Sequence, residues 1–477
     1  MPYETIIGLE VHAELATKSK IYCSCTTEFG GEVNTHTCPI CAGFPGTLPV
    51  LNKQVVEYAI KAGLAIDCAI TPHGKQDRKN YFYPDLPKAY QVSQFDLPVC
   101  VGGHLDITVD DEERRIGITR IHIEEDAGKL LHDVSGDTLV DYNRCGVPLI
   151  EIVTEPDMRS AEEARVFLEM LKSILEYTEV SDCKMQEGSL RCDVNVSVRP
   201  VGQAELGTRT EMKNVNSFRA AYRAIQYESA RQIEVLEGEG TIRQETRRWD
   251  DDKGITYPMR SKEEAHDYRY FPEPDLAPIE IDPAWVERVR ATLPELPHVK
   301  KARYVEKCGL TDYEAGQISA SKAMAAFFDA TVKAGAQSKT VANWLLGDIS
   351  RILNEQSVEA IAIPFKPEHL AELIAIIEEG VISNSAGKKV IEELFENPHE
   401  PRKIVEEKGL AQISDKSALV EAVREVLKTN PQSVADFKAG KDKAIGFLVG
   451  QAMRATKGKG NPQLLNEILR EELNKEA

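Results

Sequence analysis

The sequence is poor in the features that mark secreted, membrane and nucleic-acid-coating proteins. Its 477 residues include only 10 cysteines and 6% aromatic residues, and no apolar run approaches the roughly 18 residues of a membrane helix. Cysteine at this density excludes a secreted disulfide scaffold. Residues 1–5 lack the basic and apolar regions of a signal peptide, so we expect a cytoplasmic protein with no membrane segment.

Basic residues are also scarce. The chain has 58 Lys and Arg against 77 Asp and Glu, a net charge of −19, so it is not a general nucleic-acid coat and we expect no DNA partner. Residues 401–477 differ, because their 14 basic and 11 acidic residues give +3 against −22 elsewhere. Basic residues there gather around glycines 440, 458 and 460, which favours either a local phosphate-binding surface or a solvated helical face. They are Lys438, Lys441, Lys443, Arg454, Lys457 and Lys459.

Hydrophobic periodicity changes near residue 295. Before it, Val/Ile/Thr-rich stretches alternate with turn residues, which predicts strands. The expected strands cover residues 4–17, 105–107, 115–125, 149–154, 189–200 and 207–215. Two helices interrupt them, one after the capping box Ser160-Ala-Glu-Glu163 and one over residues 217–237.

After Pro294 and Pro297 almost every segment has helical periodicity, and a Pro-containing break at residues 397–401 separates a tail. We therefore predict an α+β fold with a mixed or antiparallel sheet, followed by helical regions. The expected domains are residues 1–294, 295–400 and 401–477.

Four cysteines stand in two close pairs, Cys23-Ser-Cys25 and Cys38-Pro-Ile-Cys41. Four thiolates suit a tetrahedral zinc ion, and the neighbouring glycines and proline favour the turns that such a knuckle needs. His36 could replace one sulfur, and free cysteines in a turn-rich segment are the alternative. Because no acid or base stands among the four, we interpret the zinc as structural.

Several strands combine one apolar face with one charged face. The two-residue period places Glu10, His12 and Glu14 opposite the apolar residues of the first strand. The same period groups Arg191, Asp193 and Asn195 on a second strand, and Arg209, Glu211 and Lys213 on a third. Such a sheet face is either solvated or a binding floor, where carboxylates hold Mg²⁺ and basic residues hold phosphate oxygens.

Two further acidic segments belong with this floor. Glu124, Glu125 and Asp126 end a strand, and a divalent cation would relieve their mutual repulsion. Glu151 lies inside an otherwise apolar strand, so it needs a metal ion or a cationic partner; a structural salt bridge is the alternative.

Residues 77–91 interleave basic and aromatic side chains, including Lys79 and Tyr81, between stiffening prolines. Such a segment could stack a nucleobase while holding a phosphate, and a rigid loop with internal aromatic packing explains the composition equally well.

Seven ordered motifs are spread along the chain, and the resemblance that they carry covers essentially its whole length. They are GLEVHAEL at 8–15, DRKNYFYPD at 77–85, EEDAGK at 124–129, PLIEI at 148–152, EGSLRCDVN at 187–195, DYRYFPEPD at 267–275 and GFLVGQ at 446–451. In them the sequence resembles the B-subunit family of the aspartyl/glutamyl-tRNA amidotransferases. The resemblance implies a cradle-shaped, glutamine-synthetase-like catalytic domain, a helical domain, and a YqeY-type tail that holds tRNA.

The resemblance also implies a reaction. Misacylated Glu-tRNA(Gln) or Asp-tRNA(Asn) is phosphorylated on its side-chain carboxylate by ATP with Mg²⁺, and ammonia then displaces phosphate. The sequence shows no convincing nucleophile and base for glutamine hydrolysis, so the ammonia is expected from a separate amidase, the A subunit, with a small C subunit completing a heterotrimer. The alternatives are a free-standing carboxylate–amine ligase and a non-catalytic tRNA scaffold.

By motif match, the resemblance implies that His12, Glu125 and Glu151 are metal ligands, with Glu10 close by. Strict alternation from His122 would instead place Glu124 on the floor, so the choice of Glu125 requires a strand irregularity near residue 124. The expected substrate or nucleotide contacts are Lys79, Tyr81, Arg191, Asp193, Asn195 and Lys213. Cys23, Cys25, Cys38 and Cys41 match a zinc knuckle that some members carry.

Overall fold

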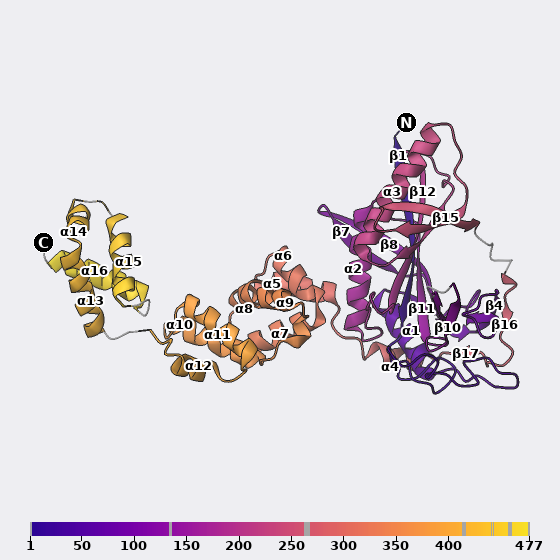
Figure 1. Ribbon diagram of the computed structural model, residues 1–477, viewed down its shortest axis with the longest axis horizontal. Coiled ribbons are helices and arrows are strands. Elements are labelled where there is room, and N and C mark those ends of the chain that lie inside the picture. The colour runs from indigo at the N-terminus through magenta and orange to yellow at the C-terminus, as the bar shows by residue number, and fades with distance from the viewer. Residues whose placement is uncertain are drawn as a thin grey trace. The chain divides into compact units, whose positions relative to one another are not determined.

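The computed structural model describes residues 2–132, 136–261, 268–412, 416–439, 441, 443–456 and 460–475. The chain forms two compact units, Met1–Pro297 and His298–Ala477 (Figure 1). The first unit combines a large mixed sheet with helices, and the described part of the second is almost entirely helical. The α+β prediction is therefore confirmed. Among the described residues, no helix has the length and apolarity to cross a membrane.

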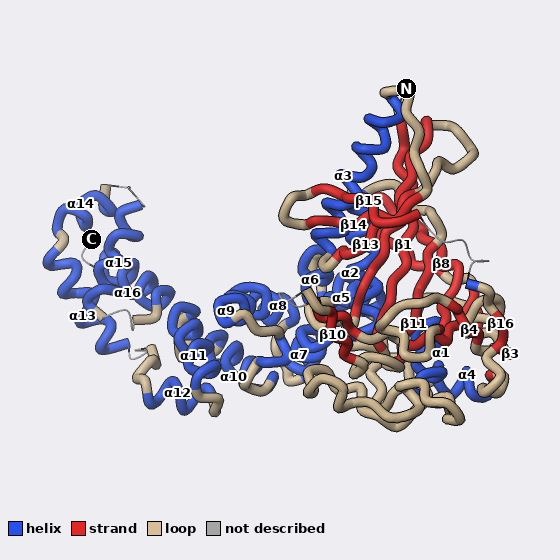
Figure 2. Tube along the Cα trace, turned by 45° about the vertical axis from the view of Figure 1, so that its right-hand side comes forward, coloured by secondary structure: helices blue, strands red, loops and turns tan. Residues whose placement is uncertain are grey.

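The central sheet has ten strands. In spatial order they are β15 (Ile255–Ser261), β14 (Glu245–Asp250), β13 (Thr210–Val215), β12 (Leu190–Pro200), β1 (Tyr3–Glu14), β11 (Pro148–Thr154), β8 (Glu112–Glu125), β6 (Cys100–Val101) and β2 (Ala69–Ile70), with β7 (His104–Val109) paired to β8. Neighbours are antiparallel except β13 and β14, which are parallel. Figure 2 shows the long strands β1 and β8 in the middle of this unit.

Smaller ladders hold the loops around the sheet. One joins β16 (Phe271–Pro272), β4 (Asp77–Asn80) and β5 (Tyr90–Ser93). The others pair β10 (Thr138–Asp141) with β9 (Lys129–His132), and β17 (Ile279–Glu280) with β3 (His73–Gly74). The β16–β4 pairing matters most here, because it brings residues near 270 beside residues near 80.

One face of the central sheet is packed and the other is polar. In β1 the apolar residues Ile7, Leu9, Val11 and Ala13 are buried in the main core. The helices α1 (Lys53–Ala65), α2 (Ala161–Tyr177) and α3 (Phe218–Glu237) pack against the strands. Burial of these alternating apolar side chains stabilises the sheet and leaves Glu10, His12 and Glu14 on the opposite face.

The start of α2 differs in one detail from the prediction. Ser160 Oγ accepts a hydrogen bond from the Glu163 amide at 3.1 Å, as a capping box requires. The Glu163 carboxylate, however, accepts at 2.7 Å from the amide of Arg159 rather than from that of Ser160. The second hydrogen bond of the predicted capping box is therefore wrong, because the Glu163 carboxylate binds the amide of the residue before Ser160.

The second unit follows α4 (Pro283–Arg290) and consists of short helices. They are α5 (Pro297–Cys308), α6 (Asp312–Ala320), α7 (Lys322–Lys333), α8 (Ser338–Trp344), the π-helix η2 (Leu345–Ile349), α9 (Ser350–Gln356), the 3₁₀ turn η3 (Ala360–Ala362), α10 (Pro367–Glu378), α11 (Asn384–Glu396), α12 (Pro401–Glu407), α13 (Lys416–Thr429), α14 (Pro431–Lys438), α15 (Lys443–Ala455) and α16 (Pro462–Lys475). α12 packs on α10 and α11, whereas α13, α15 and α16 share a separate core. The predicted three-domain boundaries stay a prediction.

Candidate active site

The polar face of the sheet gathers two histidines and two glutamates from three adjacent strands. The register pairs His12 of β1 with Glu151 of β11, and Glu151 with His122 of β8. Because opposed residues of antiparallel strands point to the same face, these side chains converge. His12 Nδ1 lies 3.2 Å from a Glu124 oxygen and 3.9 Å from Glu151, while His122 Nε2 lies 3.2 Å from Glu151 and 3.8 Å from Glu124.

Both carboxylates of this cluster are nearly buried, and the imidazoles of His12 and His122 lower the pKa of each. Burial would raise the pKa of Glu151, but the charges of His122 and His12 outweigh it and lower the pKa to about 2. Burial likewise opposes the charge on His122, but Glu151 and Glu124 raise its pKa to about 9. In this structure the two imidazoles therefore balance the two carboxylates of the cluster.

His12, Glu124 and Glu151 each offer one ligand atom, and these atoms lie within 4.8 Å of one another. Carboxylate oxygens are the ligands that Mg²⁺ prefers, usually together with retained waters. The donor set and its spacing fit a divalent cation, which would neutralise the carboxylates as the imidazoles do in this structure. We call His12, His122, Glu124 and Glu151 the central cluster.

The structure places Glu124, and not Glu125, beside His12 and Glu151. The β8–β11 register runs without a break from Glu125 to Arg120, and its one irregularity lies at residues 153–154. The predicted strand irregularity near residue 124 is therefore wrong, and ordinary alternation sends residue 125 to the opposite face. There Glu125 pairs with Lys88 and accepts a hydrogen bond from the Val92 amide at 2.8 Å.

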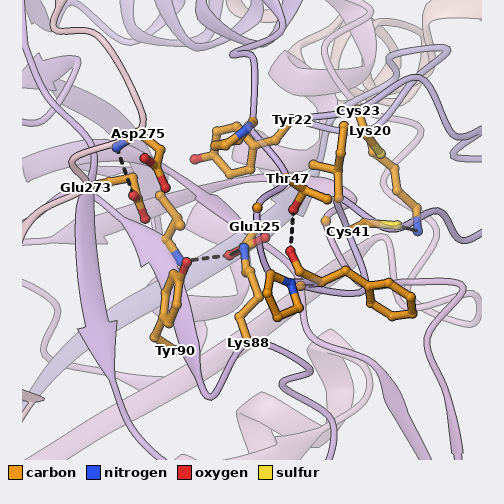
Figure 3. A pocket seen from close by; sticks show the side chains of 18 residues that line it. Lys20, Tyr22, Cys23, Cys41, Thr47, Lys88, Tyr90, Glu125, Glu273 and Asp275 are labelled. Carbon is orange, nitrogen blue, oxygen red and sulfur yellow. Dashed lines mark hydrogen bonds and ion pairs between the residues drawn. The ribbon is translucent and has the colours of Figure 1, made fainter.

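Glu125 faces a different cavity, of about 220 Å³. Figure 3 shows Cys23 and Cys41 on one side of this cavity, Glu273 and Asp275 on the other, and Glu125 between them. Glu125 is buried, pairs with Lys88 and lies next to the cysteine segment. It is therefore not a member of the central cluster.

A second acidic group borders the central cluster. Oxygens of Glu10, Asp193 and Glu211 lie within 4.8 Å of one another, and Lys213 Nζ lies 2.5 Å from Asp193 and 3.6 Å from Glu211. Burial opposes the charge on Lys213, but Asp193 and Glu211 raise its pKa, so the ammonium stays charged. Asn195 donates to Glu10 at 2.9 Å. Here a lysine already supplies the balancing cation.

A cavity of about 560 Å³ brings most of the predicted residues together. Its lining includes Glu10, His12, Lys79, Glu151, Asp193 and Lys213. Arg191, Asn195, Tyr81 and Glu125 are absent from this lining. We call it the reaction cavity.

The predicted residues outside the reaction cavity have other partners. Arg191 donates to Asp126 at 2.8 Å, and Asn195 lines a neighbouring cavity of about 450 Å³ that also contains Glu10. The Tyr81 hydroxyl donates to Gln91 Oε1 at 3.1 Å. These residues therefore lie around the reaction cavity rather than on its open surface.

Among the residues that line the reaction cavity but were not expected as metal, substrate or nucleotide contacts are His122, Tyr268, Tyr270 and Glu211, the last of which was placed only on the charged sheet face. Alternation is the signal that finds His122 and Glu211, because each stands two residues from a charged residue on the same strand face. No local pattern places the two tyrosines there, since only the pairing of β16 with β4 brings their segment to the site.

The four cysteines form one cluster. Their sulfur atoms lie within 4.8 Å of one another, and the sulfurs of Cys38 and Cys41 are 4.0 Å apart. A tetrahedral zinc with bonds of about 2.3 Å separates its sulfurs by about 3.8 Å, so the set fits a zinc ion. His36 is not a member; its carbonyl instead accepts from Lys20 Nζ at 2.7 Å.

Comparison with known proteins gives two family matches. The GatB/GatE catalytic domain matches residues 5–287, and the GatB domain of the Yqey type matches residues 326–473. The chain is 64% identical over 479 residues to the B subunit of the aspartyl/glutamyl-tRNA(Asn/Gln) amidotransferase of Caldicellulosiruptor bescii, with 100% of each chain covered. Proteins of the same name in Thermoanaerobacter pseudethanolicus and Brevibacillus brevis are 62% and 58% identical, covering 99–100% of each chain.

Proposed function

The chain belongs to the GatB/GatE family, and from this membership we propose that it activates the side-chain carboxylate of tRNA-bound aspartate or glutamate with ATP for amidation. Its relatives are named for the amidotransferase that acts on aspartyl- and glutamyl-tRNA. The reaction is a glutamine-dependent amide ligation in protein biosynthesis. Membership covers both units, because the two family matches lie in both.

The observation that carries the proposal is the central cluster, of which His12, His122 and Glu151 line the reaction cavity and Glu124 lies against His12. A carboxylate is a poor electrophile, because its oxygen does not leave. Phosphorylation brings two anions together, and the site must neutralise both of them. The ionised Glu124 and Glu151 with His12 are a set that can hold Mg²⁺ for this purpose. When bound, Mg²⁺ supplies charge neutralisation of the phosphate and carboxylate oxygens.

The chain's own residues orient the reactants. Lys213 and Lys79 both line the reaction cavity and offer ammonium groups to phosphate or carboxylate oxygens. Asp193 and Glu211 hold Lys213 in place, and Asn195 fixes Glu10. The terminal phosphoryl group of ATP passes to a side-chain carboxylate oxygen, and ADP leaves. Ammonia then attacks the acyl carbon and phosphate departs, leaving the amide.

The cysteine cluster would have a structural role. Four sulfurs leave no open ligand position for a substrate, and a zinc ion there would hold the turns of residues 23–41. The segment borders the cavity that Glu125 faces, which is separate from the reaction cavity, and we assign it no part in the chemistry.

The ammonia comes from other subunits. The relatives are named as B subunits, which indicates an assembly of several different chains. We infer as partners an amidase (the A subunit), a small C subunit and misacylated tRNA, in the cytoplasm. Amide formation with ammonium chloride, without glutamine, isolates the step assigned to this chain.

The test is conversion of Glu-tRNA(Gln) or Asp-tRNA(Asn) to the amidated form by the assembled enzyme with ATP, Mg²⁺ and ammonium chloride. Amide that forms only when ATP is present supports the proposal. Amide formation without ATP, or equal activity on free glutamate, contradicts it.

A further inference from the structure

A continuous run of aromatic side chains leads from the reaction cavity to the surface. Phe95 stacks on Tyr270 with ring centroids 4.5 Å apart and an interplanar angle of 10°. Tyr270 contacts Tyr268 at 6.0 Å, Tyr268 contacts Tyr81 at 5.9 Å, and Tyr81 contacts Tyr83 at 6.3 Å. We call these five rings the aromatic run.

The inner end of the run belongs to the reaction cavity. Phe95, Tyr268 and Tyr270 line the same space as His12 and Glu151. Lys79 lies against the run, with its Nζ 5.1 Å from the Tyr268 ring centroid and 5.7 Å from that of Tyr81. The run therefore begins where the reacting carboxylate is expected.

Both ends of the run are open to solvent. Phe95, which lines the reaction cavity, is 49% exposed; Tyr83, at the end away from the cavity, is 45% exposed, and its neighbour Phe82 is 88% exposed. Phe82 buries too little surface to act as core packing, so internal aromatic packing does not account for it. Two cations accompany these rings: Lys79 lies against Tyr81 and Tyr268, and Arg269 stands between Tyr268 and Tyr270. This composition suits nucleobases better than an apolar protein surface.

The aromatic run is held rigidly by an otherwise unfavourable backbone. Arg269, between Tyr268 and Tyr270, has φ of +46°, which is costly for a residue with a side chain. Asn80 Nδ2 donates to the carbonyls of Tyr268 and Arg269 at 3.2 and 2.9 Å and so fixes this turn. A preformed binding surface loses little entropy when a flexible ligand binds.

We infer that the aromatic run, together with its exposed neighbour Phe82, binds the unpaired 3′ end of the aminoacylated tRNA, with the terminal bases stacked from Tyr268 outward to Tyr83 and Phe82. The inference rests on the proposed function. An aminoacyl group is only a few bonds long, so when its carboxylate reaches the central cluster the terminal nucleotide must lie at the cavity mouth. Unpaired bases stack on aromatic rings, and exposed Arg269 is available for a backbone phosphate.

The test uses the assembled enzyme with misacylated tRNA, ATP and ammonium chloride, and compares Phe82→Leu, Tyr83→Leu and the control Phe29→Leu. Phe29 is 72% exposed in the same unit but outside the run. Loss of one stacking ring is expected to raise the KM for tRNA about five-fold or more. The KM for ATP and the kcat at saturating tRNA stay within two-fold, and the control is unchanged.

A second measurement reports stacking directly. tRNA with 2-aminopurine as the third base from its 3′ end, the unpaired base that the inference places against the outer rings, should lose fluorescence on binding to the wild-type assembly and recover it in the Phe82→Leu and Tyr83→Leu variants. Unchanged KM and unchanged quenching in both variants overturn the inference. A rise in the KM for ATP instead of tRNA also overturns it, since the rings would then hold adenosine.

Failure of the proposed function has a different signature. In that case the wild-type assembly forms no ATP-dependent amide, whereas failure of this inference leaves wild type and variants equally active. The fluorescence measurement needs only binding and decides the inference in either case.

Discussion

At the scale of single residues, two adjacent glutamates have different environments because a strand alternates its faces. Glu124 lies with His12 and Glu151, and Glu125 lies with Lys88 across the sheet. Alternation predicts this from sequence, whereas motif similarity led to Glu125. Sequence alone does not reveal Tyr268 and Tyr270 at the site, because their position depends on a long-range strand pairing.

The two glutamates give a matched prediction. Glu124→Gln keeps the shape of the side chain but removes a charged ligand, so amide formation with ammonium should fall at least about 100-fold and require more Mg²⁺. Glu125→Gln, of equal size, should leave the Mg²⁺ concentration for half-maximal activity within about two-fold. Titration of Mg²⁺ against activity measures both. The opposite pattern would show that the metal ligand is Glu125.

At the scale of elements, apolar periodicity predicts the long strands and helices well. The predicted strands 149–154 and 189–200 correspond to Pro148–Thr154 and Leu190–Pro200, and the predicted helix 217–237 to Phe218–Glu237. The strands β14 and β15 were not predicted, because charged residues such as Arg247 and Arg248 obscure their period. Their place is set by pairing with β13 rather than by local pattern.

The cap of α2 gives a prediction of stability. Ser160→Ala removes the acceptor of the Glu163 amide, so the free energy of unfolding should fall by about 1 kcal/mol, and Ser160→Thr should retain most of it. Urea denaturation of the three proteins measures the difference. Equal midpoints for Ser160→Ala and wild type would mean that the bond of Glu163 to the Arg159 amide suffices to hold the helix start.

The cysteine cluster gives a second prediction at this scale. Elemental analysis should find about one zinc per chain. Cys38→Ser should lower the melting temperature by about 5 °C or more, because metal binding and folding are coupled. Cys308→Ser, outside the cluster, is the control and should have little effect. A fully folded, zinc-free preparation with four freely reacting thiols in the cluster would disprove the zinc site.

At the scale of the whole molecule, charge is divided unevenly along the chain. The net charge of −19 should repel tRNA, and residues 401–477 alone carry a positive balance. α13, α15 and α16 have their own core, which indicates that the tail can fold as a separate part. Lys457, Lys459 and glycines 440 and 458 lie outside the described residues, so the phosphate-binding surface predicted there stays a prediction.

Truncation tests the role of the tail. A chain that ends at Gln412 keeps α12 with its partners α10 and α11. In the assembled enzyme it should show a raised KM for tRNA with an unchanged KM for ATP. The salt dependence of tRNA affinity should also become shallower, by roughly 0.7–0.9 in the logarithmic slope for each phosphate that is no longer neutralised. Equal slopes for both chains would leave the tail's lysines as a solvated face.

The central claim is that ATP activates the side-chain carboxylate in the reaction cavity. It is tested most directly with Glu-tRNA(Gln) whose side-chain carboxylate carries ¹⁸O, incubated with the assembled enzyme, ATP and ammonium chloride. Because the phosphorylated oxygen leaves with the phosphate, the account predicts one ¹⁸O in inorganic phosphate for each amide formed. Amide formation accompanied by phosphate without ¹⁸O would contradict it.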